Sequence, residues 1–337
     1  MMIKEAIEKA VSKVDLNEAE MMAVMEEIME GQATPAQIGS FITALRMKGE
    51  TVEEVTGAAR IMRQKATHVN ACATTVVDTC GTGGDRLNTF NISTTAAFVV
   101  AAAGITVAKH GNRAVSSGCG SADVLEALGV NVSAGQEIVE ECLQQIGIGF
   151  LFAPKMHGAM KYAIGPRREI GIRTIFNMLG PLTNPAGATA QLLGVYEPKL
   201  TEMFAGVLRK MGTKRAFVVH GADGMDEITV SGSSRVAELH DGIIKTYNIN
   251  PADYFGAIHP LSAIHGGDPS YNSRLTRDVL TGKKGACRDI VVINAAFAIM
   301  AGGKAEKIED GIKIAEECID GGAAVRKLQE LIQMSNG

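Results

Sequence analysis

The segment from Asp78 to Ser93 reads DTCGTGGDRLNTFNIS and holds three glycines within four positions, at 81, 83 and 84. A β-branched run (74–77) precedes it and an Ala- and Val-rich run (94–103) follows it, so the segment is predicted to connect a strand to a buried helix. Glycine permits a positive φ and close approach of a ligand, and the start of a helix offers unpaired N–H groups to an anion. The segment therefore predicts a phosphate-binding loop.

A tight turn that binds nothing is the alternative interpretation of this segment. Such a turn needs only a few residues, whereas the glycines here are followed by a dense run of hydroxyl and amide side chains. The segment matches neither the P-loop, which requires Gly-Lys-Ser/Thr, nor the Gly-x-Gly-x-x-Gly fingerprint of dinucleotide-binding proteins. It is thus predicted to bind an anion outside those two classes.

The composition is that of a globular protein with a substantial core, because 46% of the 337 residues are hydrophobic and 21% are charged. The net charge of -4, without a long run of Lys or Arg, disfavours binding to nucleic acid or to a membrane surface. No transmembrane-type run or signal-peptide core is found, so a cytoplasmic location is predicted. Six scattered cysteines indicate neither a zinc site nor a disulfide framework.

Residues 3 to 65 are predicted to form four short helices. Thr34 with Gln37 and Thr51 with Glu54 have the spacing of capping boxes, which mark helix starts. A helical unit followed by alternating strands and helices is typical of a small α domain attached to a larger α/β domain. The helical periodicity stops near 68–74, so we expect the domains to span 1–70 and 71–337.

A second polar cluster follows the next predicted strand (105–108). It runs from Lys109 to Asp123 and combines two cations, a histidine, an asparagine and several serines with glycines. Ligands of open α/β sheets bind beyond the carboxyl ends of the strands, so this loop and the first one are expected to face one crevice. A merely solvated loop would need neither so many glycines nor so many short donors.

A third cluster is basic and lies between 155 and 174. Gly165-Pro166 is predicted to be a turn before a helix whose first turn holds Arg167 and Arg168. The forked donors of arginine match a carboxylate, although a surface ion pair is the more common role of any one arginine. Residues 177–185 are predicted to form a turn-rich hinge.

A strand predicted at 216–220 leads into an acidic loop that contains Asp223, Asp226 and Glu227. Adjacent carboxylates near hydroxyl groups suit a hard cation such as Mg²⁺ shared with a substrate's phosphates. An acidic surface turn would be the better interpretation of this loop alone. Beside two predicted phosphate loops, the metal role is favoured.

Together these motifs resemble those of the anthranilate phosphoribosyltransferases, a family of tryptophan biosynthesis. The resemblance covers nearly the whole chain in the same order, and related nucleoside phosphorylases share the fold without this set. Its motifs are Gly81-Thr82-Gly83-Gly84-Asp85, Thr89-Phe90-Asn91-Ile92-Ser93-Thr94, Lys109-His110-Gly111-Asn112-Arg113, Gly120-Ser121-Ala122-Asp123, Gly165-Pro166-Arg167-Arg168-Glu169 and Asp223-Gly224-Met225-Asp226-Glu227.

The resemblance implies an α/β protein in which a small N-terminal helical domain, joined by helices from about 163–180, precedes a large α/β domain with a central, mostly parallel sheet. It also implies a homodimer formed through the helical domain and an active site in the cleft between the domains. The implied reaction transfers the phosphoribosyl group of 5-phosphoribosyl 1-pyrophosphate to the amine of anthranilate, giving N-(5-phosphoribosyl)anthranilate and pyrophosphate with Mg²⁺ as cofactor.

The resemblance further implies roles for individual residues. Anthranilate would contact Gly81, Asn112 and Arg167, and Mg²⁺ would contact Ser93, Asp226 and Glu227. Phosphoribosyl pyrophosphate would contact Gly81, Gly84, Asp85, Thr89, Asn91, Ile92, Ser93, Thr94, Lys109, His110, Gly111, Asn112, Arg113, Ala114, Val115, Ser116, Ser117 and Ser121.

The catalytic residues expected for this reaction are Lys109 and His110. Lys109, backbone N–H groups and Mg²⁺ can stabilise the negative charge of the leaving pyrophosphate. His110 can accept the proton of the amine, or it can have a structural role; the sequence leaves both open. Two other functions also remain open, a nucleoside phosphorylase and a non-catalytic nucleic-acid-binding relative of the same fold.

Overall fold

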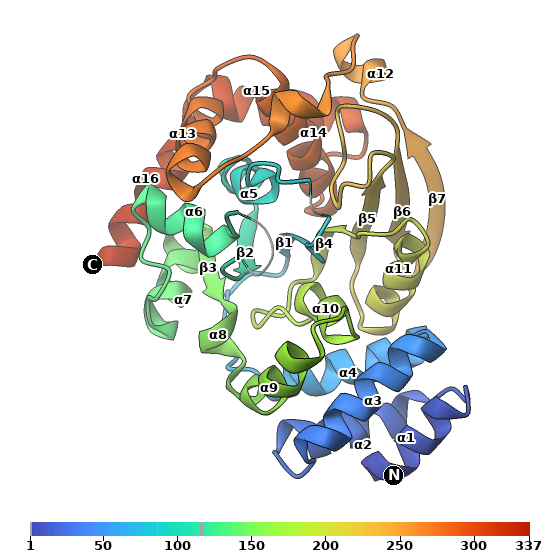
Figure 1. The fold of residues 1–337 in the computed structure, drawn as a ribbon. Helices are drawn as coiled ribbons and strands as arrows, with labels where there is room; N and C mark the ends of the chain where they lie inside the picture. The colour runs from blue at the N-terminus through green and yellow to red at the C-terminus, as the bar shows by residue number, and fades with distance from the viewer. Residues whose placement is uncertain (1, 86, 115–117) are drawn as a thin grey trace.

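The computed structural model describes residues 2–85, 87–114 and 118–337. A helical part formed by the N-terminal residues lies against one end of a larger part built on a single sheet (Figure 1). This arrangement confirms the predicted fold class. In the described part of the chain, no helix is both long and apolar enough to cross a bilayer.

Four helices make up the N-terminal part, as predicted. Asn17, Thr34 and Thr51 each accept the N–H of the residue three positions later, closing the capping boxes that start the second, third and fourth helices. The helices are α1 (Ile3–Val11), α2 (Glu18–Met29), α3 (Pro35–Lys48) and α4 (Val52–Gln64).

Two later helices pack against this bundle. Helix α9 (Lys161–Ile170) contacts α2 and α3, and α10 (Phe176–Leu179) contacts α4. Their side chains Ala163 and Phe176 share one buried apolar cluster with the bundle and with the adjacent face of the sheet. The exact limits of the two domains stay a prediction.

The sheet has seven strands in the order β3-β2-β1-β4-β5-β6-β7. The pairs from β3 to β5 are parallel, whereas β6 and β7 add an antiparallel edge. The strand order reverses at β1, because the chain continues to β2 on one side and later returns to β4 on the other. The strands are β1 (Val76–Gly81), β2 (Thr106–Gly111), β3 (Ile148–Phe152), β4 (Ala190–Gly194), β5 (Arg215–Gly221), β6 (Ser234–His240) and β7 (Ile243–Ile249).

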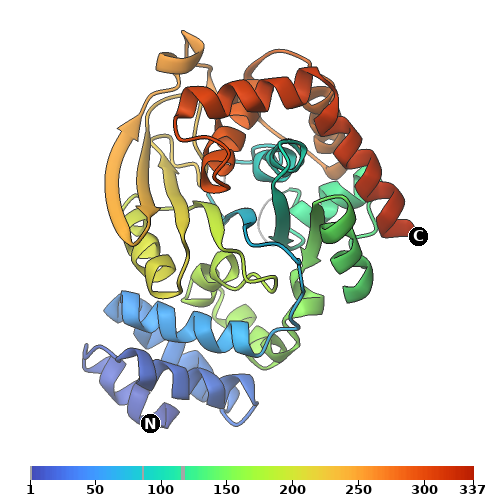
Figure 2. The same ribbon diagram turned by 180° about the vertical axis from the view of Figure 1, so that it is seen from behind.

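Alternate residues of the strands pack into different layers. In β5, Phe217 and Val219 join the apolar cluster beneath α5 and α14, whereas Ala216 and Val218 join the cluster shared with the helical bundle. Figure 2 shows the C-terminal helices covering the first of these faces. The remaining helices are α5 (Ile92–Ala102), α6 (Ser121–Leu128), α7 (Gln136–Gln145), α8 (Ala153–Met156), α11 (Leu200–Lys210), α12 (Ala252–Phe255), α13 (Pro269–Leu280), α14 (Ala286–Ala301), α15 (Ile308–Asp320) and α16 (Ala323–Asn336).

Two predicted loops begin later than expected. Gly81 pairs with Gly194, and Lys109 to Gly111 pair with β3, so the first residues of both polar clusters belong to strands. The glycines did not end these strands because Gly81 pairs with β4 and Gly111 with β3, and these parallel neighbours supply backbone hydrogen bonds. Asp268-Pro269, which also has the sequence of a turn, instead caps and starts α13.

The prediction that Arg167 and Arg168 lie in the first turn of a helix is wrong. Pro166 lies inside α9, both arginines are in its last turn, and Gly171 ends the helix in a left-handed conformation. Proline removes one N–H donor without forcing this short, tertiary-packed helix to stop. The segment predicted as a hinge at 177–185 likewise contains the end of α10 and one 3-10 turn, Gly180–Leu182.

Two helical glycines provide a matched test of packing in the bundle. A Cβ on Gly57 would lie 2.6 Å from the carbonyl oxygen of Glu18 in α2, whereas a Cβ on Gly39 would meet only Ile170 at 3.7 Å. We expect Gly57→Ala to destabilise the protein by about 1–3 kcal/mol through overpacking. Gly39→Ala is expected to be neutral or to stabilise by up to about 1 kcal/mol. Urea unfolding measures both, and equal effects would contradict the close approach of α2 and α4.

Candidate active site

The predicted site residues gather at the carboxyl ends of β1, β2 and β4, where the strand order reverses (Figure 1). The acidic loop after β5 reaches the glycine-rich loop: Gly83 N–H donates to Asp226 Oδ2 at 2.7 Å. Ser93 N–H, at the start of α5, donates to Glu227 Oε1 at 3.1 Å. The structure therefore joins the glycine-rich loop and the acidic loop through backbone amides and carboxylates.

Small residues make this approach possible. A Cβ on Gly81 would overlap the Asp226 carboxylate, and a Cβ on Gly194 would overlap the Asp226 backbone. Gly81 was predicted for its contact with ligands, yet here it also admits the acidic loop. Gly194 carried no signal in the sequence, because its partner is 32 residues away in the chain.

Burial and mutual repulsion perturb the acids of this site. Burial, reinforced by the nearby Asp85, raises the pKa of Asp226 to about 7. Burial and then Asp226 raise the pKa of Glu227 well above its ordinary value, and Glu227 Oε2 is buried without a hydrogen-bond partner. A divalent cation would offset the negative charge of these carboxylates and would be bound by the unpartnered Glu227 Oε2. The residues therefore fit Mg²⁺.

The third acid of the loop has a different role. Asp223 Oδ2 accepts the hydroxyl protons of Thr229, at 2.5 Å, and of Ser231, and Asp223 Oδ1 accepts Met225 N–H. These bonds hold the loop and leave Asp223 out of the acidic cluster. In the residues that the structure describes, no three His, Cys, Asp or Glu side chains already have the arrangement of a metal site.

Lys109 lies beneath the same loop. Its ammonium group is buried and donates to Thr79 O at 2.5 Å and to Ser93 Oγ at 3.4 Å. Burial lowers its pKa, and the negative charge of Asp78 partly opposes that shift. Asp78 is itself buried, where it accepts His110 N–H and the Asn184 amide. Asp78 was predicted only as the start of the loop, whereas it lies inside β1 and is fully buried.

The ring of His110 is held on both sides. Its Nδ1 faces Gly180 O at 3.2 Å and must donate, because a carbonyl only accepts. Its Nε2 lies 3.2 Å from His157 Nε2, and in a neutral ring whose Nδ1 donates, this nitrogen can only accept. Burial lowers the pKa of His110 to about 3 and that of His157 to about 4. This geometry favours the structural role over proton acceptance, and His157 is a site residue that the sequence analysis missed.

The second polar loop folds back onto the start of α6. Ser121 Oγ accepts Asn112 N–H at 3.1 Å, and Gly111 leaves room for that hydroxyl. Arg113 pairs with Asp123 at 3.0 Å and Glu126 at 2.8 Å. Three of the residues predicted to contact phosphoribosyl pyrophosphate, Val115, Ser116 and Ser117, lie outside the described residues.

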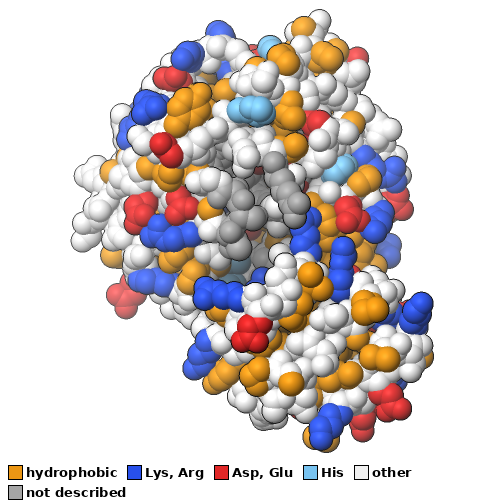
Figure 3. Space-filling view, in the orientation of Figure 1, with side chains coloured by type: hydrophobic (Ala, Val, Ile, Leu, Met, Phe, Trp, Pro, Cys, Tyr) orange, Lys and Arg blue, Asp and Glu red, His pale blue; other side chains and the backbone are white. Residues whose placement is uncertain are grey.

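Arg167 extends from α9 near the junction of the two parts. Its guanidinium lies 5.1 Å from the ring centre of Phe176. Burial is the cause that lowers its pKa, and among the residues described no acid offsets it. A half-buried arginine of this kind is suited to a carboxylate supplied by a ligand. Figure 3 shows Lys and Arg side chains on both sides of the middle of this face.

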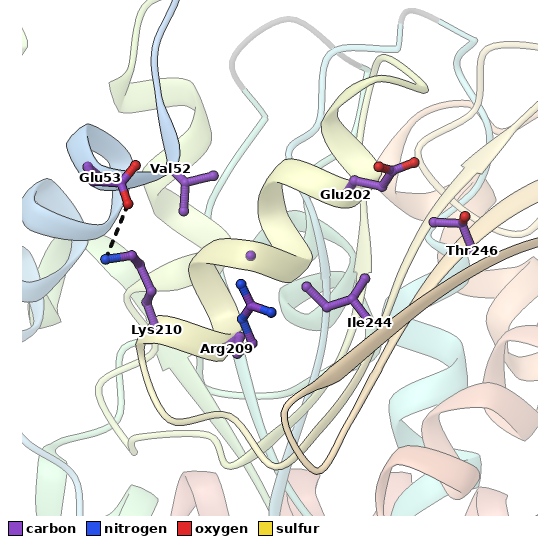
Figure 4. A pocket seen from close by; sticks show the side chains of 8 residues that line it. Val52, Glu53, Glu202, Arg209, Lys210, Ile244 and Thr246 are labelled. Carbon is purple, nitrogen blue, oxygen red and sulfur yellow. Dashed lines mark ion pairs between the residues drawn. The ribbon is translucent and has the colours of Figure 1, made fainter. Parts of the chain in front are cut away.

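A separate hollow, drawn in Figure 4, lies between the start of α4, α11 and β7. Two of its acids are already paired, Glu53 with Lys210 at 3.3 Å and Glu202 with Arg235 outside the hollow, whereas Arg209 has no ion pair among the described residues. It shares no residue with the loops at the ends of β1, β2 and β4. The hollow is therefore separate from the predicted phosphate site, and in the part of the chain that the structure describes it offers a single unpaired cation, Arg209.

Asp226 provides a test of the acidic cluster without turnover. Its native pKa lies above its ordinary value, so the folded protein loses stability as pH rises from 3.8 to about 7. We expect Asp226→Asn, in thermal melts without metal, to raise Tm by a difference that grows over this range to roughly 4 °C. MgCl₂ at pH 8 should stabilise the wild type and not the variant. A difference independent of pH would contradict the raised pKa.

Two family models match this chain, one over the helical part and one over the part built on the sheet. The helical bundle domain of a glycosyl transferase family matches residues 4–66, and the α/β domain of that family matches residues 73–325. Curated relatives include an anthranilate phosphoribosyltransferase from Citrifermentans bemidjiense, 57% identical over 99% of this chain and 99% of its own. Another, from Syntrophobacter fumaroxidans, is 58% identical with the same coverage.

Solved structures agree with these sequence matches. The crystal structure of anthranilate phosphoribosyltransferase from Thermus thermophilus has a TM-score of 0.94 and 40% identity, covering 98% of this chain and 99% of the other. The Saccharomyces cerevisiae enzyme in complex with PRPP and Mg has a TM-score of 0.90 and 28% identity, covering 99% and 98%. The chain thus has the architecture of the glycosyl transferases that join a helical bundle to an α/β domain. Within that class, it belongs to the anthranilate phosphoribosyltransferase family.

Proposed function

We propose that this protein transfers the phosphoribosyl group of 5-phosphoribosyl 1-pyrophosphate (PRPP) to the amine of anthranilate, releasing pyrophosphate. The observation that carries this proposal is the pair Asp226 and Glu227, held by the N–H groups of Gly83 and Ser93 inside an anion-binding loop. A phosphate loop with its own cation-binding acids suits a substrate bearing pyrophosphate. Relatives that match over their full length and are named anthranilate phosphoribosyltransferase support the proposal.

The main chemical demand is to stabilise charge on the leaving pyrophosphate. Asp226, Glu227 and Ser93 would hold Mg²⁺, which when bound supplies electrostatic stabilisation of that charge. The buried ammonium of Lys109 lies 3.4 Å from Ser93 Oγ, next to this position. The starts of α5 and α6 add N–H groups and positive helix-dipole ends. These groups are fixed before the reaction, which is the condition for strong electrostatic catalysis.

The acceptor needs orientation more than activation. The aromatic amine attacks C1′ of the ribose, and its proton becomes acidic as the new bond forms. His110 and His157 stay neutral and hydrogen-bonded to each other, so we assign them to shaping the site. Arg167 is proposed to bind the carboxylate of anthranilate, and Asn112 and Gly81 are proposed to contact the same molecule.

We also propose a homodimer formed through the helical domain. The apolar side chains Met2, Val11, Val14 and Met47 are exposed on this domain, and Tyr162 and Ile164 are exposed on the adjoining α9. Exposed apolar side chains that gather into one contiguous patch are typical of an interface. Sedimentation as a 35.5 kDa monomer would contradict it.

Neither alternative function is favoured. A nucleoside phosphorylase would use phosphate in place of pyrophosphate and would not need the paired acids of the loop or Arg167. A nucleic-acid-binding relative should present an extended basic groove, whereas the chain carries a net charge of -4.

The decisive assay follows the fluorescence of anthranilate. We expect anthranilate to be consumed only when PRPP and MgCl₂ are both present, with one pyrophosphate released per anthranilate. Asp226→Asn combined with Glu227→Gln should lower turnover about 100-fold or more, because the cation site loses its charge. Consumption without PRPP, or full activity of the double variant in saturating MgCl₂, would refute the donor or the metal assignment.

Arg167→Ala tests the acceptor site. Loss of a charged hydrogen-bond donor is expected to raise the KM for anthranilate roughly 10- to 100-fold, while the KM for PRPP changes little. Arg168→Ala is the matched control, because its exposed side chain follows on the same helical turn. Equal changes in both KM values would place Arg167 at the phosphate site or in the structure of α9.

A further inference from the structure

The segment before and within α13 packs against the phosphate loops. Thr89 forms a β-bridge with His265, and Gly266 N–H donates to Asn88 O at 2.8 Å. A Cβ on Gly266 would lie 2.7 Å from Thr89 O, so the approach requires glycine. Residues 265–266 therefore pack directly against the loop that precedes α5.

One buried side chain of α13 makes the next connection. Asn272 is 1% exposed, and its Oδ1 accepts Gly267 N–H at 2.7 Å. A backbone N–H can only donate, so this contact fixes which end of the amide is oxygen. The Nδ2 group then donates to Asn91 Oδ1 at 3.0 Å. The amide orientation of Asn91 is set in turn.

Asn91 connects the starts of two helices. It is the residue before α5, yet its side chain does not cap that helix. Its Nδ2 instead donates at 3.1 Å to the carbonyl oxygen of Cys119, which precedes Gly120 at the start of α6. Hydrogen bonds thus run from Gly267 through Asn272 and Asn91 to Cys119. They hold together the N-termini of α5 and α6, and a helix N-terminus is a feature that can bind phosphate.

We propose that Asn272 is a positioning residue for PRPP, acting through Asn91. Without its donor, the Asn91 amide loses the partner that aligns it, and the starts of α5 and α6 are free to separate. Small displacements of preorganised donors weaken binding and catalysis strongly. This inference rests on the proposed function for the identity of the ligand, but not for the hydrogen bonds themselves.

Asn272→Asp is the sharpest variant, because it keeps the acceptor for Gly267 and replaces only the donor to Asn91. We expect the KM for PRPP to rise about tenfold or more, the size expected for one disrupted buried hydrogen bond. The KM for anthranilate at saturating PRPP should change little. Thr276→Val is the matched control, since it removes the 3.0 Å hydroxyl contact between α13 and Thr95 of α5. That control should lower Tm and leave both KM values unchanged.

A double variant tests whether Asn272 acts through Asn91. Asn91→Ala with Asn272→Asp should bind PRPP no more weakly than Asn91→Ala alone, whereas independent roles would give additive losses. Asn272→Ala, which also removes the donor to Asn91, replaces the Asp variant if that protein does not fold.

Calorimetric titration with PRPP and MgCl₂ separates this inference from the proposed function. A wild type that binds PRPP but consumes no anthranilate would refute the proposed acceptor, while a weaker Kd in Asn272→Asp would still support the inference. Unchanged PRPP affinity in Asn272→Asp, additive losses in the double variant, or equal rises in both KM values would overturn it.

Discussion

The approach of the acidic loop to the paired ends of β1 and β4 is the constraint on which the site depends. The Asp226 backbone lies so close to Gly194, and its carboxylate so close to Gly81, that neither position tolerates a Cβ. These glycines are paired with each other in the sheet. The sheet thus determines where the acids lie, and the amides of Gly83 and Ser93 then determine how they point. Preorganisation here begins with backbone packing.

Charge at the site is arranged in two layers. Asp85, Asp226 and Glu227 repel one another near the proposed cation position, and burial raises the pKa values of the last two. Below them, Lys109 and Asp78 are buried close to each other, and their opposite charges partly compensate. A cation and a phosphorylated ligand would complete this arrangement, because a cation favours the ionised form of the upper acids and the loop around them offers N–H donors. The site stores unfavourable electrostatics that binding relieves.

The structural features that could be predicted from the sequence are those whose residues are neighbours in the chain. The glycines at 81–84, the paired acids at 226–227 and the helix caps at Thr34 and Thr51 each form a local pattern, and the fold class followed from their order. Residues whose partners are distant in the chain were missed. His157 meets His110 across 47 positions, and Asn272 meets Asn91 across 181. The roles assigned to Arg167 and to the other substrate contacts stay predictions. The predicted position of Arg167 in the first turn of its helix was wrong, because packing of α9 on α3 outweighed the tendency of Pro166 to start a helix.

The apolar cluster beneath the sheet has a consequence for how the chain folds. It joins residues of the first four helices to α9, α10, α11 and the adjacent face of β4 and β5 without interruption. Neither the bundle nor the sheet can bury its apolar surface alone, since each forms one wall of the other's core. The two parts should therefore unfold in a single cooperative transition rather than as separate units. Damage to helix packing far from the strand ends would then lower the population of the whole folded protein.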